Sequence, residues 1–338
     1  MNILTDHPLQ NYSTFGIDVK AKFFVEINSE DDINDLLHKK DFINEPKLVL
    51  GGGSNLLFIK DFDGLIFKIS ILGINIVEED GDNVLIKAGA GVLWDDLVSY
   101  AIENNYGGIE NLILIPGTVG AAPIQNIGAY GQELAETFHS LNGIYVESGE
   151  IKSFAKDECK FGYRDSIFKN ELRNKIIITS VNLRLNKEPS AQLSYQEVIS
   201  EVENQNILNP TIIDVSGIIS NIRKEKLPHQ NKLKNAGSFF KNPVISIKKY
   251  ENIKDIYPDL KFYPVDDENV KIPAAWLIEK CQLKGKRKGS VGTHQNQPLV
   301  IVNFGGATGK EVLDFATMIK ESVYEKFAIS LEYEVNII

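Results

Sequence analysis

The spacing of apolar positions predicts strands alternating with amphipathic helices through the first half of the chain. Residues 30–40 follow a capping pair, Asn28-Ser29, and place Ile33, Leu36 and Leu37 on one helical face. A second amphipathic helix is expected over residues 93–105. The expected strands cover residues 21–27, 47–50, 64–70, 74–80, 83–91 and 175–185. The pattern therefore predicts a mixed protein of helices and sheets.

The pattern changes in the second half of the chain. Residues 188–215 are polar and look partly helical, and a new α/β unit is expected from about Ile218. Helices are predicted near 274–283 and over 309–327, the second of which opens with the capping-box pair Thr308 and Glu311. A strand is expected over residues 330–338 at the end of the chain.

Composition narrows the class of protein. The 338 residues are 43% hydrophobic and 24% charged, which is typical of a globular protein with a sizeable core. The net charge of -10 argues against broad binding to nucleic acid or anionic membranes. The sequence has no apolar run near the roughly 20 residues that span a bilayer, and no signal peptide is recognised. Cys159 and Cys281 form neither a disulfide framework nor a metal motif, so we expect a cytoplasmic protein with no metal site.

Two glycine-rich loops are the first candidates for a ligand site. Residues 51–55, Gly-Gly-Gly-Ser-Asn, follow a predicted buried strand and can form a backbone nest for an anion. The dinucleotide-binding helix motif is excluded because Leu56 replaces its third glycine and no helix follows. The phosphate-loop motif is excluded because Glu311 follows Gly309-Lys310. The second loop covers residues 116–134. Taken alone, each loop is more readily explained as a structural turn. Taken together, the two loops suggest a dinucleotide whose pyrophosphate is held by backbone amides.

Seven stretches of the sequence carry more specific patterns than the glycine loops alone. They are NYSTFGI (11–17), GGGSNLLF (51–58), PGTVGAAPIQNIGAYG (116–131), CKFGYRDSIFK (159–169), KLPHQNKLKNAGSFFKNP (226–243), AAWLIEKCQLKG (274–285) and LEYEV (331–335). FGYRDSIFK and NAGSFFKNP are far more specific than the glycine patterns. Together the seven stretches resemble one family, the UDP-N-acetylenolpyruvoylglucosamine reductases of bacterial peptidoglycan synthesis. They occur in that family's order and reach from residue 11 to residue 335.

The resemblance implies an α+β fold with an FAD-binding region of the vanillyl-alcohol-oxidase type. We expect an FAD-binding domain over residues 1–189, with subdomains of about 1–70 and 71–189. A substrate-binding domain would cover 190–338 and include a tyrosine loop at about 190–215. The implied reaction uses NADPH to reduce non-covalently bound FAD, which passes hydride to the enolpyruvyl group of a UDP-sugar. The expected product is UDP-N-acetylmuramate.

The resemblance also assigns three catalytic residues. Ser238 matches the family's proton donor, Arg164 its carboxylate-binding arginine, and Glu334 its glutamate near the C-terminus. Without the resemblance, Ser238 is a turn residue, Arg164 pairs with an acid such as Asp165, and Glu334 points outward from a strand. Glu332 is a competitor for the role of Glu334, because both are expected on the same strand face.

Further positions are carried over as ligand contacts. Ala121 and Ala122 stand where relatives may carry hydroxyl residues, so the pyrophosphate would depend there on backbone amides. The expected FAD contacts are Gly51, Gly52, Gly53, Ser54, Asn55, Pro116, Gly117, Gly120, Ala121, Ile124, Asn126 and Ile127. The expected substrate contacts are Tyr195, Lys226, Asn242 and Gln297, with Arg223, Tyr130 and Tyr263 as additions.

Two other functions compete with the reductase. The first is an FAD oxidase built on the same cofactor fold and acting on another alcohol or sugar. The second is a non-catalytic nucleotide-sugar binding protein. NAGSFFKNP and Lys226 favour the reductase, because an unrelated oxidase has no need of them. We expect a monomer whose partners are small molecules, with no nucleic acid and no membrane among them.

Overall fold

The structure is a computed structural model that describes residues 1–230 and 232–338 and divides into two compact units. The first unit consists of Met1–His7, Ala21–Gly53 and Phe62–Arg223, and the second of Pro8–Lys20, Ser54–Asp61 and Lys224–Ile338. Asn231, within the stretch 226–243 that resembles the family, lies outside the described residues. Along the chain the last change from the first unit to the second comes after Arg223. The domain boundary at 189/190 stays a prediction.

The first sheet of the first unit has the strand order β1-β2-β5-β3. Strands β2 and β3 both pair with β5 in parallel. Helix α1 begins after Ser29, whose hydroxyl accepts a hydrogen bond from the Asp32 N–H at 3.1 Å and completes a capping box. The predicted cap and helix are therefore confirmed. The elements are β1 (Ile3–Pro8), β2 (Lys20–Ile27), α1 (Glu30–Leu37), β3 (Lys47–Leu50) and β5 (Phe62–Ile69).

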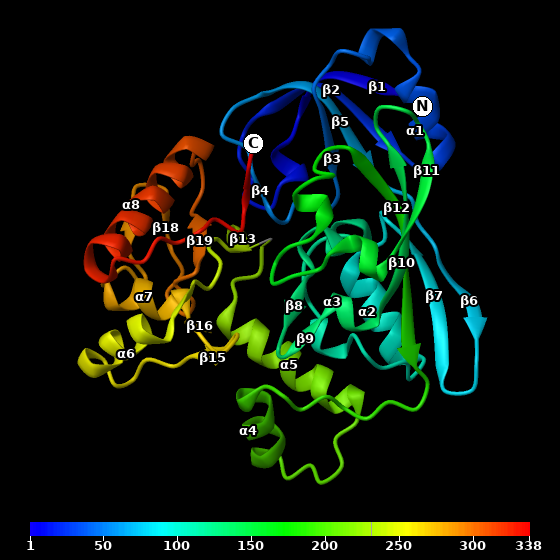
Figure 1. The fold of residues 1–338 in the computed structure, drawn as a ribbon. Helices are drawn as coiled ribbons and strands as arrows, with labels where there is room; N and C mark the ends of the chain where they lie inside the picture. Colours follow the sequence, from blue (N-terminus) through cyan, green and yellow to red (C-terminus); the bar gives the residue numbers. More distant parts are fainter. Residues whose placement is uncertain (231) are drawn as a thin grey trace. The chain divides into compact units, whose positions relative to one another are not determined.

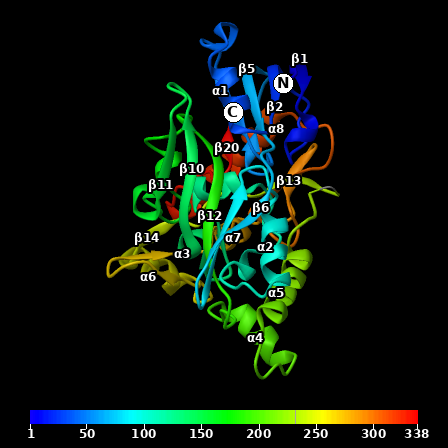
Figure 2. The same ribbon diagram turned by 90° about the vertical axis from the view of Figure 1, so that its right-hand side faces the viewer.

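The second sheet of this unit is antiparallel, with the strand order β11-β10-β12-β7-β6. Its long strands lie side by side in Figures 1 and 2. The change from one sheet to the other falls between Ile69 and Ile74, close to the expected subdomain boundary at about 70. The elements are β6 (Ile74–Glu79), β7 (Asn83–Gly89), α2 (Trp94–Glu103), β10 (Phe138–Tyr145), β11 (Ile151–Ala155) and β12 (Ile176–Asn186).

Both sheets and helix α2 contribute to one hydrophobic core. Phe67 from the first sheet, Ile86 from the second and Trp94 from α2 are all fully buried in it. The Trp94 indole N–H also donates to the Leu112 carbonyl at 3.0 Å, so its polar group is satisfied inside the core. This core fixes the framework from which the glycine loops project.

Two helices, α4 (Gln196–Asn204) and α5 (Ile212–Lys226), follow the second sheet. The sequence prediction placed the start of a new unit at about Ile218, but one continuous helix runs through that position. Its apolar residues recur three and four positions apart, so they share a face and pack with α4 in a small separate core. That core is formed by Val198, Val202, Val215, Ile218, Ile219 and Ile222.

Gly217 lies on the exposed side of α5, and a Cβ added there would meet no atom within 4 Å. We expect Gly217→Ala to raise the free energy of unfolding by about 0.5–1 kcal/mol, because alanine loses less backbone entropy in a helix. Urea unfolding followed by circular dichroism measures the change. A variant less stable than the parent would contradict this description of the helix.

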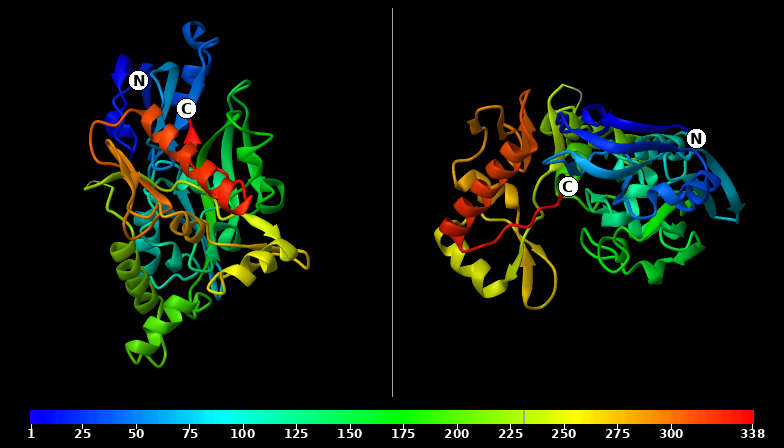
Figure 3. Two further views of the ribbon diagram at one scale, coloured as in Figure 1. Left: turned by 90° about the vertical axis from the view of Figure 1, so that its left-hand side faces the viewer. Right: turned by 90° about the horizontal axis from the view of Figure 1, so that it is seen from above.

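The main sheet of the second unit has the order β13-β19-β18-β17. Helix α8 contacts β18 and β19 and can be followed in Figure 3. The predicted capping box at its start is confirmed, since Thr308 Oγ1 accepts from Glu311 N–H at 3.2 Å. The elements are β13 (Lys234–Ser238), β17 (Arg287–Lys288), β18 (Val291–Thr293), β19 (Val300–Asn303), α7 (Ala274–Lys280) and α8 (Gly309–Phe327).

A three-stranded sheet of order β14-β16-β15 and helix α6 complete the second unit. The expected strand over 330–338 is mostly wrong. Only β20 forms there, and it pairs in parallel with β4. The backbone N–H of Glu334 donates to the Phe239 carbonyl, whereas the N–H of Asn336 donates to the Asn55 carbonyl. The segment therefore pairs with two different parts of the chain instead of forming one continuous strand. The elements are β4 (Leu56–Leu57), β14 (Val244–Ser246), α6 (Ile247–Ile256), β15 (Tyr263–Pro264), β16 (Asn269–Lys271) and β20 (Asn336–Ile337).

Candidate active site

The two glycine loops, 65 residues apart in the sequence, lie against each other in the first unit. A Cβ built on Gly51 would come within 2.5 Å of Thr118 Oγ1, and one on Gly52 within 2.9 Å of the Gly117 Cα. Gly53 and Gly117 have φ angles of +62° and +125°, which favour glycine. The backbone of residues 51–53 lies so close to that of residues 117–118 that side chains would not fit, which explains the consecutive glycines in the first loop.

Thr118 carries an unpaired hydroxyl in this cradle. Thr118 is only 3% exposed, and its Oγ1 is buried without a hydrogen-bond partner among the residues that the structure describes. Such an atom is costly unless a ligand satisfies it. A pyrophosphate or a ring carbonyl of FAD provides the required acceptor, so the cradle fits this cofactor. The sequence interpretation missed Thr118, although its position directly after Pro116-Gly117 was a usable signal.

Other expected FAD contacts shape the second loop. A Cβ on Gly120 would come within 2.5 Å of the Ala90 Cβ, so close packing requires glycine there. Asn126 is 1% exposed with φ +44°, and its side chain is fully used inside the protein. Its Nδ2 donates to Glu133 at 2.7 Å and to the Gly162 carbonyl at 3.1 Å, while its Oδ1 accepts from the Ala135 N–H.

The Asn126 side chain therefore holds neighbouring loops in place. If Asn126 contacts a cofactor, the contact would come from its backbone. Ile124 is 36% exposed and Ile127 is 7% exposed, so Ile124 is the more accessible of these two expected contacts. The Ile124 carbonyl accepts a hydrogen bond from the Ser166 hydroxyl at 2.7 Å.

Arg164 lies in a tight turn attached to the second glycine loop. The turn is closed by reciprocal backbone hydrogen bonds between Gly162 and Asp165, of 3.0 and 3.2 Å, and Arg164 has φ +54°. Its Nη2 donates to the Gly128 carbonyl, and a Cβ on Gly128 would meet its Nη1 at 3.0 Å. Asp165 Oδ1 accepts from Asn170 at 2.9 Å. The motifs FGYRD and IGAYG are thus held together in the first unit.

Tyr130, Tyr195 and Arg223 form a cluster in the first unit. The two tyrosine rings meet edge to face with centroids 5.2 Å apart. Burial raises the pKa of Tyr130, and the nearby Arg223 opposes that shift. Burial likewise lowers the pKa of Arg223, opposed by Tyr130 and Asp95. Arg223 Nη2 donates to the Leu114 carbonyl at 3.0 Å. The structure therefore brings together three of the expected substrate contacts.

Ser238 lies at the end of β13 in the second unit. The pairing of β13 with β19 is interrupted between Asn235 and Ser238, and Gly237 has φ +70°. The Asn235 side chain stabilises this bulge, because its Oδ1 accepts from the Gly237 N–H at 2.9 Å. Phe239 and Phe240, next in sequence, are fully buried. The half-buried Ser238 therefore lies between a β-bulge and two buried phenylalanine side chains, which restrict its position.

Glu334 lies on the segment next to Ser238. Its N–H donates to the Phe239 carbonyl at 2.9 Å, and its own carbonyl accepts from Asn55 Nδ2 at 3.2 Å. Glu332, by contrast, has a 75% exposed side chain and pairs with Lys241 at 3.4 Å. Glu334 is half-buried and is therefore the more enclosed of the two carboxylates. The hydrogen bond to Asn55 also ties the C-terminal segment down.

The remaining expected contacts in the second unit are distributed over several elements. Asn242 Oδ1 accepts a hydrogen bond at 2.9 Å from the N–H of Ala274, the first residue of α7. Gln297 lies in the loop from β18 to β19, where its Oε1 accepts from the Leu299 N–H at 3.4 Å. Lys226 ends α5 and is half-buried. Tyr263 is 40% exposed on the edge strand β15.

Two features were sought in the described part of the chain, a membrane-spanning helix and a cluster of metal ligands. Within residues 1–230 and 232–338, none of the helices is long and apolar enough to cross a membrane. The same residues contain no group of three or more histidine, cysteine, aspartate or glutamate side chains that could hold a metal ion.

The first unit has the fold and the loop cradle of a flavoprotein. Residues 21–154 match the family model of the FAD binding domain, and residues 228–338 match that of the UDP-N-acetylenolpyruvoylglucosamine reductase C-terminal domain. The crystal structure of UDP-N-acetylenolpyruvylglucosamine reductase from Thermus caldophilus has the same fold, with a TM-score of 0.67 and 24% identity over 99% of this chain and 98% of that one. The predicted α+β flavoprotein fold is confirmed.

Two relatives identify the family. UDP-N-acetylenolpyruvoylglucosamine reductase from Flavobacterium johnsoniae is 47% identical over the full length of both chains. The enzyme of the same name from Pseudomonas aeruginosa is 45% identical over 97% of both chains. The chain therefore belongs to the UDP-N-acetylenolpyruvoylglucosamine reductase family.

Proposed function

We propose that this protein uses NADPH and FAD to reduce UDP-N-acetylglucosamine enolpyruvate to UDP-N-acetylmuramate. Full-length similarity to reductases of that name supports the reaction. The structural observation that carries the assignment is the hydrogen bond between the Glu334 N–H and the Phe239 carbonyl, which brings the predicted acid–base residues Ser238 and Glu334 onto neighbouring segments.

The cradle of Gly51, Gly52, Gly117 and Thr118 is the proposed holding site for FAD. When bound, FAD takes hydride from NADPH and supplies it to the substrate. The close backbone packing leaves amide groups accessible where larger side chains would cover them. The buried Thr118 hydroxyl gains a partner, which favours the loaded protein over the empty one.

Ser238 is the proposed proton donor. Addition of hydride at the methylene carbon of the enolpyruvyl group leaves an electron pair on the carbon next to the carboxylate. That carbanion, stabilised as an enolate, is basic enough to take a proton from a positioned hydroxyl. The bulge at Gly237 and the buried Phe239 hold this hydroxyl in place, so the proton arrives on one defined carbon.

Arg164 and Glu334 are proposed to act at the same end of the substrate. The planar guanidinium of Arg164 can bind both oxygens of the carboxylate and stabilise the negative charge that builds there. Its Nη2 is oriented by the Gly128 carbonyl. Glu334 is proposed to orient the enolate or its carboxylate through hydrogen bonds, because the segment that carries it is fixed by Phe239 and Asn55.

The UDP portion is assigned to the remaining residues. Lys226 offers a point charge for the diphosphate, and Gln297 and the amide of Asn242 offer hydrogen bonds. Tyr195 and Tyr130, with Arg223, provide aromatic and cationic surface for the nucleotide end. Tyr263, exposed on its edge strand, is a further proposed contact.

NADPH consumption tests the reaction. Because FAD must pass its electrons to an acceptor, we expect the purified protein to oxidise NADPH rapidly only when UDP-N-acetylglucosamine enolpyruvate is present. Absorbance at 340 nm measures the rate, and a parallel sample receives oxygen without the sugar. Equal consumption in both samples would identify an oxidase, and a colourless protein that binds only the sugar would identify a non-catalytic binding protein.

We also propose that the protein acts as a monomer in the cytoplasm. Its cysteines are both free thiols. Burial raises the pKa of Cys159 to about 12, which keeps that thiol protonated and unreactive at neutral pH. Light scattering of the FAD-loaded protein tests the oligomeric state, and a dimer mass would contradict the proposal.

A further inference from the structure

The chain is strained at Leu114, just before the second glycine loop. This residue has φ +58°, in the left-handed region that a residue with a Cβ adopts only at an energetic cost. Such a conformation persists where the surroundings hold it. The next two residues transmit its direction, because Ile115 precedes a proline and Pro116 has a fixed φ. Few backbone rotations are therefore free between Leu114 and Gly117, where the proposed FAD cradle begins.

Both backbone groups of Leu114 are held by charged side chains of the first unit. Its N–H donates to Asp95 Oδ1 at 2.6 Å, and its carbonyl accepts from Arg223 Nη2 at 3.0 Å. Hydrogen bonds to ionised groups are shorter and stronger than those between neutral groups. The carboxylate and the guanidinium together therefore hold the left-handed turn in place.

Helix α2 holds the same segment at a second point. The N–H of Trp94, the first residue of the helix, donates to the Gly117 carbonyl at 3.0 Å. The Trp94 side chain is buried in the core, which fixes this end of the helix. Because Asp95 is the next residue, the first turn of α2 binds the segment on both sides of Pro116. No sequence motif marks Asp95, since its partner Leu114 lies 19 positions later.

We propose that Asp95 is a positioning residue that holds residues 114–118 in the shape that binds FAD. The proposal rests on the assignment of the glycine-loop cradle to FAD. Asp95 needs no contact with the cofactor, because its carboxylate acts through the Leu114 N–H. Without that carboxylate the left-handed turn is populated less. The apparent affinity for FAD then falls in proportion to the fraction of the protein that keeps the binding shape.

A role confined to stabilising the helix would belong equally to Asp96. Both carboxylates lie in the first turn of α2, where negative charge stabilises a helix. Asp96 is exposed, and none of the hydrogen bonds among the described residues joins its side chain to the loop. Substitutions at the two positions therefore remove the same charge from the helix, but only those at Asp95 release Leu114.

Titration of the apoprotein with FAD, followed by flavin fluorescence, tests this role. Asp95→Ala should weaken FAD binding by about 10- to 100-fold, as expected for the loss of a hydrogen bond to a charged group. Asp95→Asn keeps an acceptor oxygen and should bind FAD only about 2- to 5-fold more weakly than the parent. Asp96→Ala and Asp96→Asn are the matched controls and should bind FAD like the parent. Circular dichroism of each apoprotein checks that it is folded.

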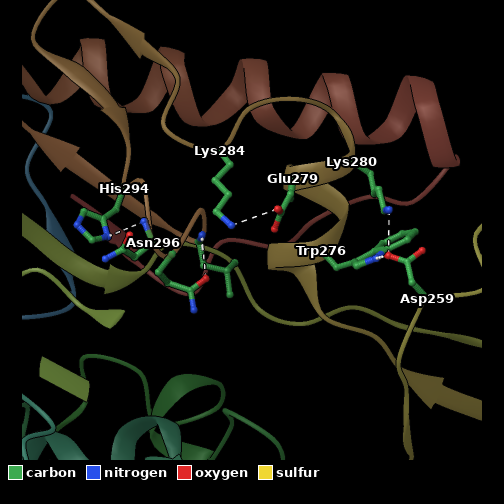
Figure 4. A network of polar contacts seen from close by, with 9 residues as sticks. Asp259, Trp276, Glu279, Lys280, Lys284, His294 and Asn296 are labelled. Atoms are coloured by element: carbon green, nitrogen blue, oxygen red, sulfur yellow. Dashed lines mark hydrogen bonds and ion pairs between the residues drawn. The ribbon is translucent and has the colours of Figure 1, made fainter. Parts of the chain in front are cut away.

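A second control separates positioning from a general loss of stability. In the second unit, Asp259 accepts from the Trp276 indole N–H at 3.0 Å and pairs with Lys280 at 2.9 Å, as Figure 4 shows. Asp259→Ala therefore also removes a hydrogen-bonded carboxylate. Any loss of stability that it causes should leave the dissociation constant of FAD unchanged. If Asp259→Ala weakens FAD binding as much as Asp95→Ala does, the effect at Asp95 is one of general stability and the proposal is wrong.

The remaining outcomes are equally decisive. An Asp95→Ala variant that binds FAD like Asp96→Ala would overturn the positioning role. An Asp95→Asn variant as weak as Asp95→Ala would also overturn it, because the charge and not the hydrogen bond would then matter. If Asp95→Ala does not fold, equal dissociation constants for Asp95→Asn and Asp96→Asn would overturn the role in the same way.

Gly52→Ala separates this proposal from the assignment on which it rests. If Gly52→Ala weakens FAD binding and Asp95→Ala does not, the cradle stands and only the positioning role is wrong. If neither substitution weakens FAD binding, the assignment of the cradle to FAD is itself wrong.

Discussion

Ser238→Ala should lower kcat for the enolpyruvyl sugar by about 10²- to 10⁴-fold, the usual contribution of a positioned general acid. Alanine has no proton to deliver to the carbanion, so the hydride adduct has no route to product except slow protonation by water. Reduction of the flavin by NADPH does not involve this proton and should keep its normal rate. Steady-state NADPH oxidation and rapid mixing with NADPH alone measure the two effects.

The control for this variant is Ser330→Ala. Ser330 is exposed and lies four residues before Glu334 in the second unit. The Ser330→Ala variant therefore loses a serine hydroxyl that is outside the proposed site. It should turn over the sugar like the parent. A Ser238→Ala variant with normal kcat would show that another group donates the proton.

Gly52→Ala should weaken FAD binding by about 5- to 150-fold, which corresponds to the 1–3 kcal/mol typical of overpacking. The added Cβ would meet the Gly117 Cα at 2.9 Å and its carbonyl carbon at 3.3 Å. Both are backbone atoms, so the loops must separate and the cradle loses its shape. The ratio of flavin to protein absorbance after purification, and titration of the apoprotein with FAD, measure the loss.

Gly81→Ala is the matched control for the glycine substitution. A Cβ at Gly81 would meet no atom within 4 Å, and the residue lies in an exposed turn of the same unit. FAD binding should therefore be unchanged in this variant. If Gly52→Ala binds FAD as tightly as Gly81→Ala does, the two loops do not form the cofactor site.

Local patterns made much of the fold predictable from the sequence. The caps at Ser29 and Thr308 and the spacing of apolar residues located α1 and α8, because these signals act within a few residues of the element. The end of the chain was less predictable. Residues 330–338 look like a strand, but their backbone partners, Phe239 and Asn55, are far away in the sequence, and no local signal shows that the partner changes.

The site residues show the same contrast. Ser238, Arg164 and Glu334 could be proposed from the sequence because they stand in recognisable motifs. Thr118 was missed, since its significance depends on what lies around it in space. The unpaired hydroxyl of Thr118 emerges only from the packing of two distant loops. The role of Asn126 as a connector also required the structure, because its partners include Gly162, 36 positions later in the chain.

Anaerobic mixing of the reduced, FAD-loaded protein with UDP-N-acetylglucosamine enolpyruvate tests the central claim most directly. Absorbance near 450 nm reports the return of oxidised flavin, and mass spectrometry identifies the sugar product. The account predicts rapid reoxidation with formation of UDP-N-acetylmuramate in the parent, and a return of colour or product slower by at least about 100-fold in Ser238→Ala. Reduced flavin that stays reduced in the parent, or reoxidation and product formation at the parent rate in Ser238→Ala, would contradict it.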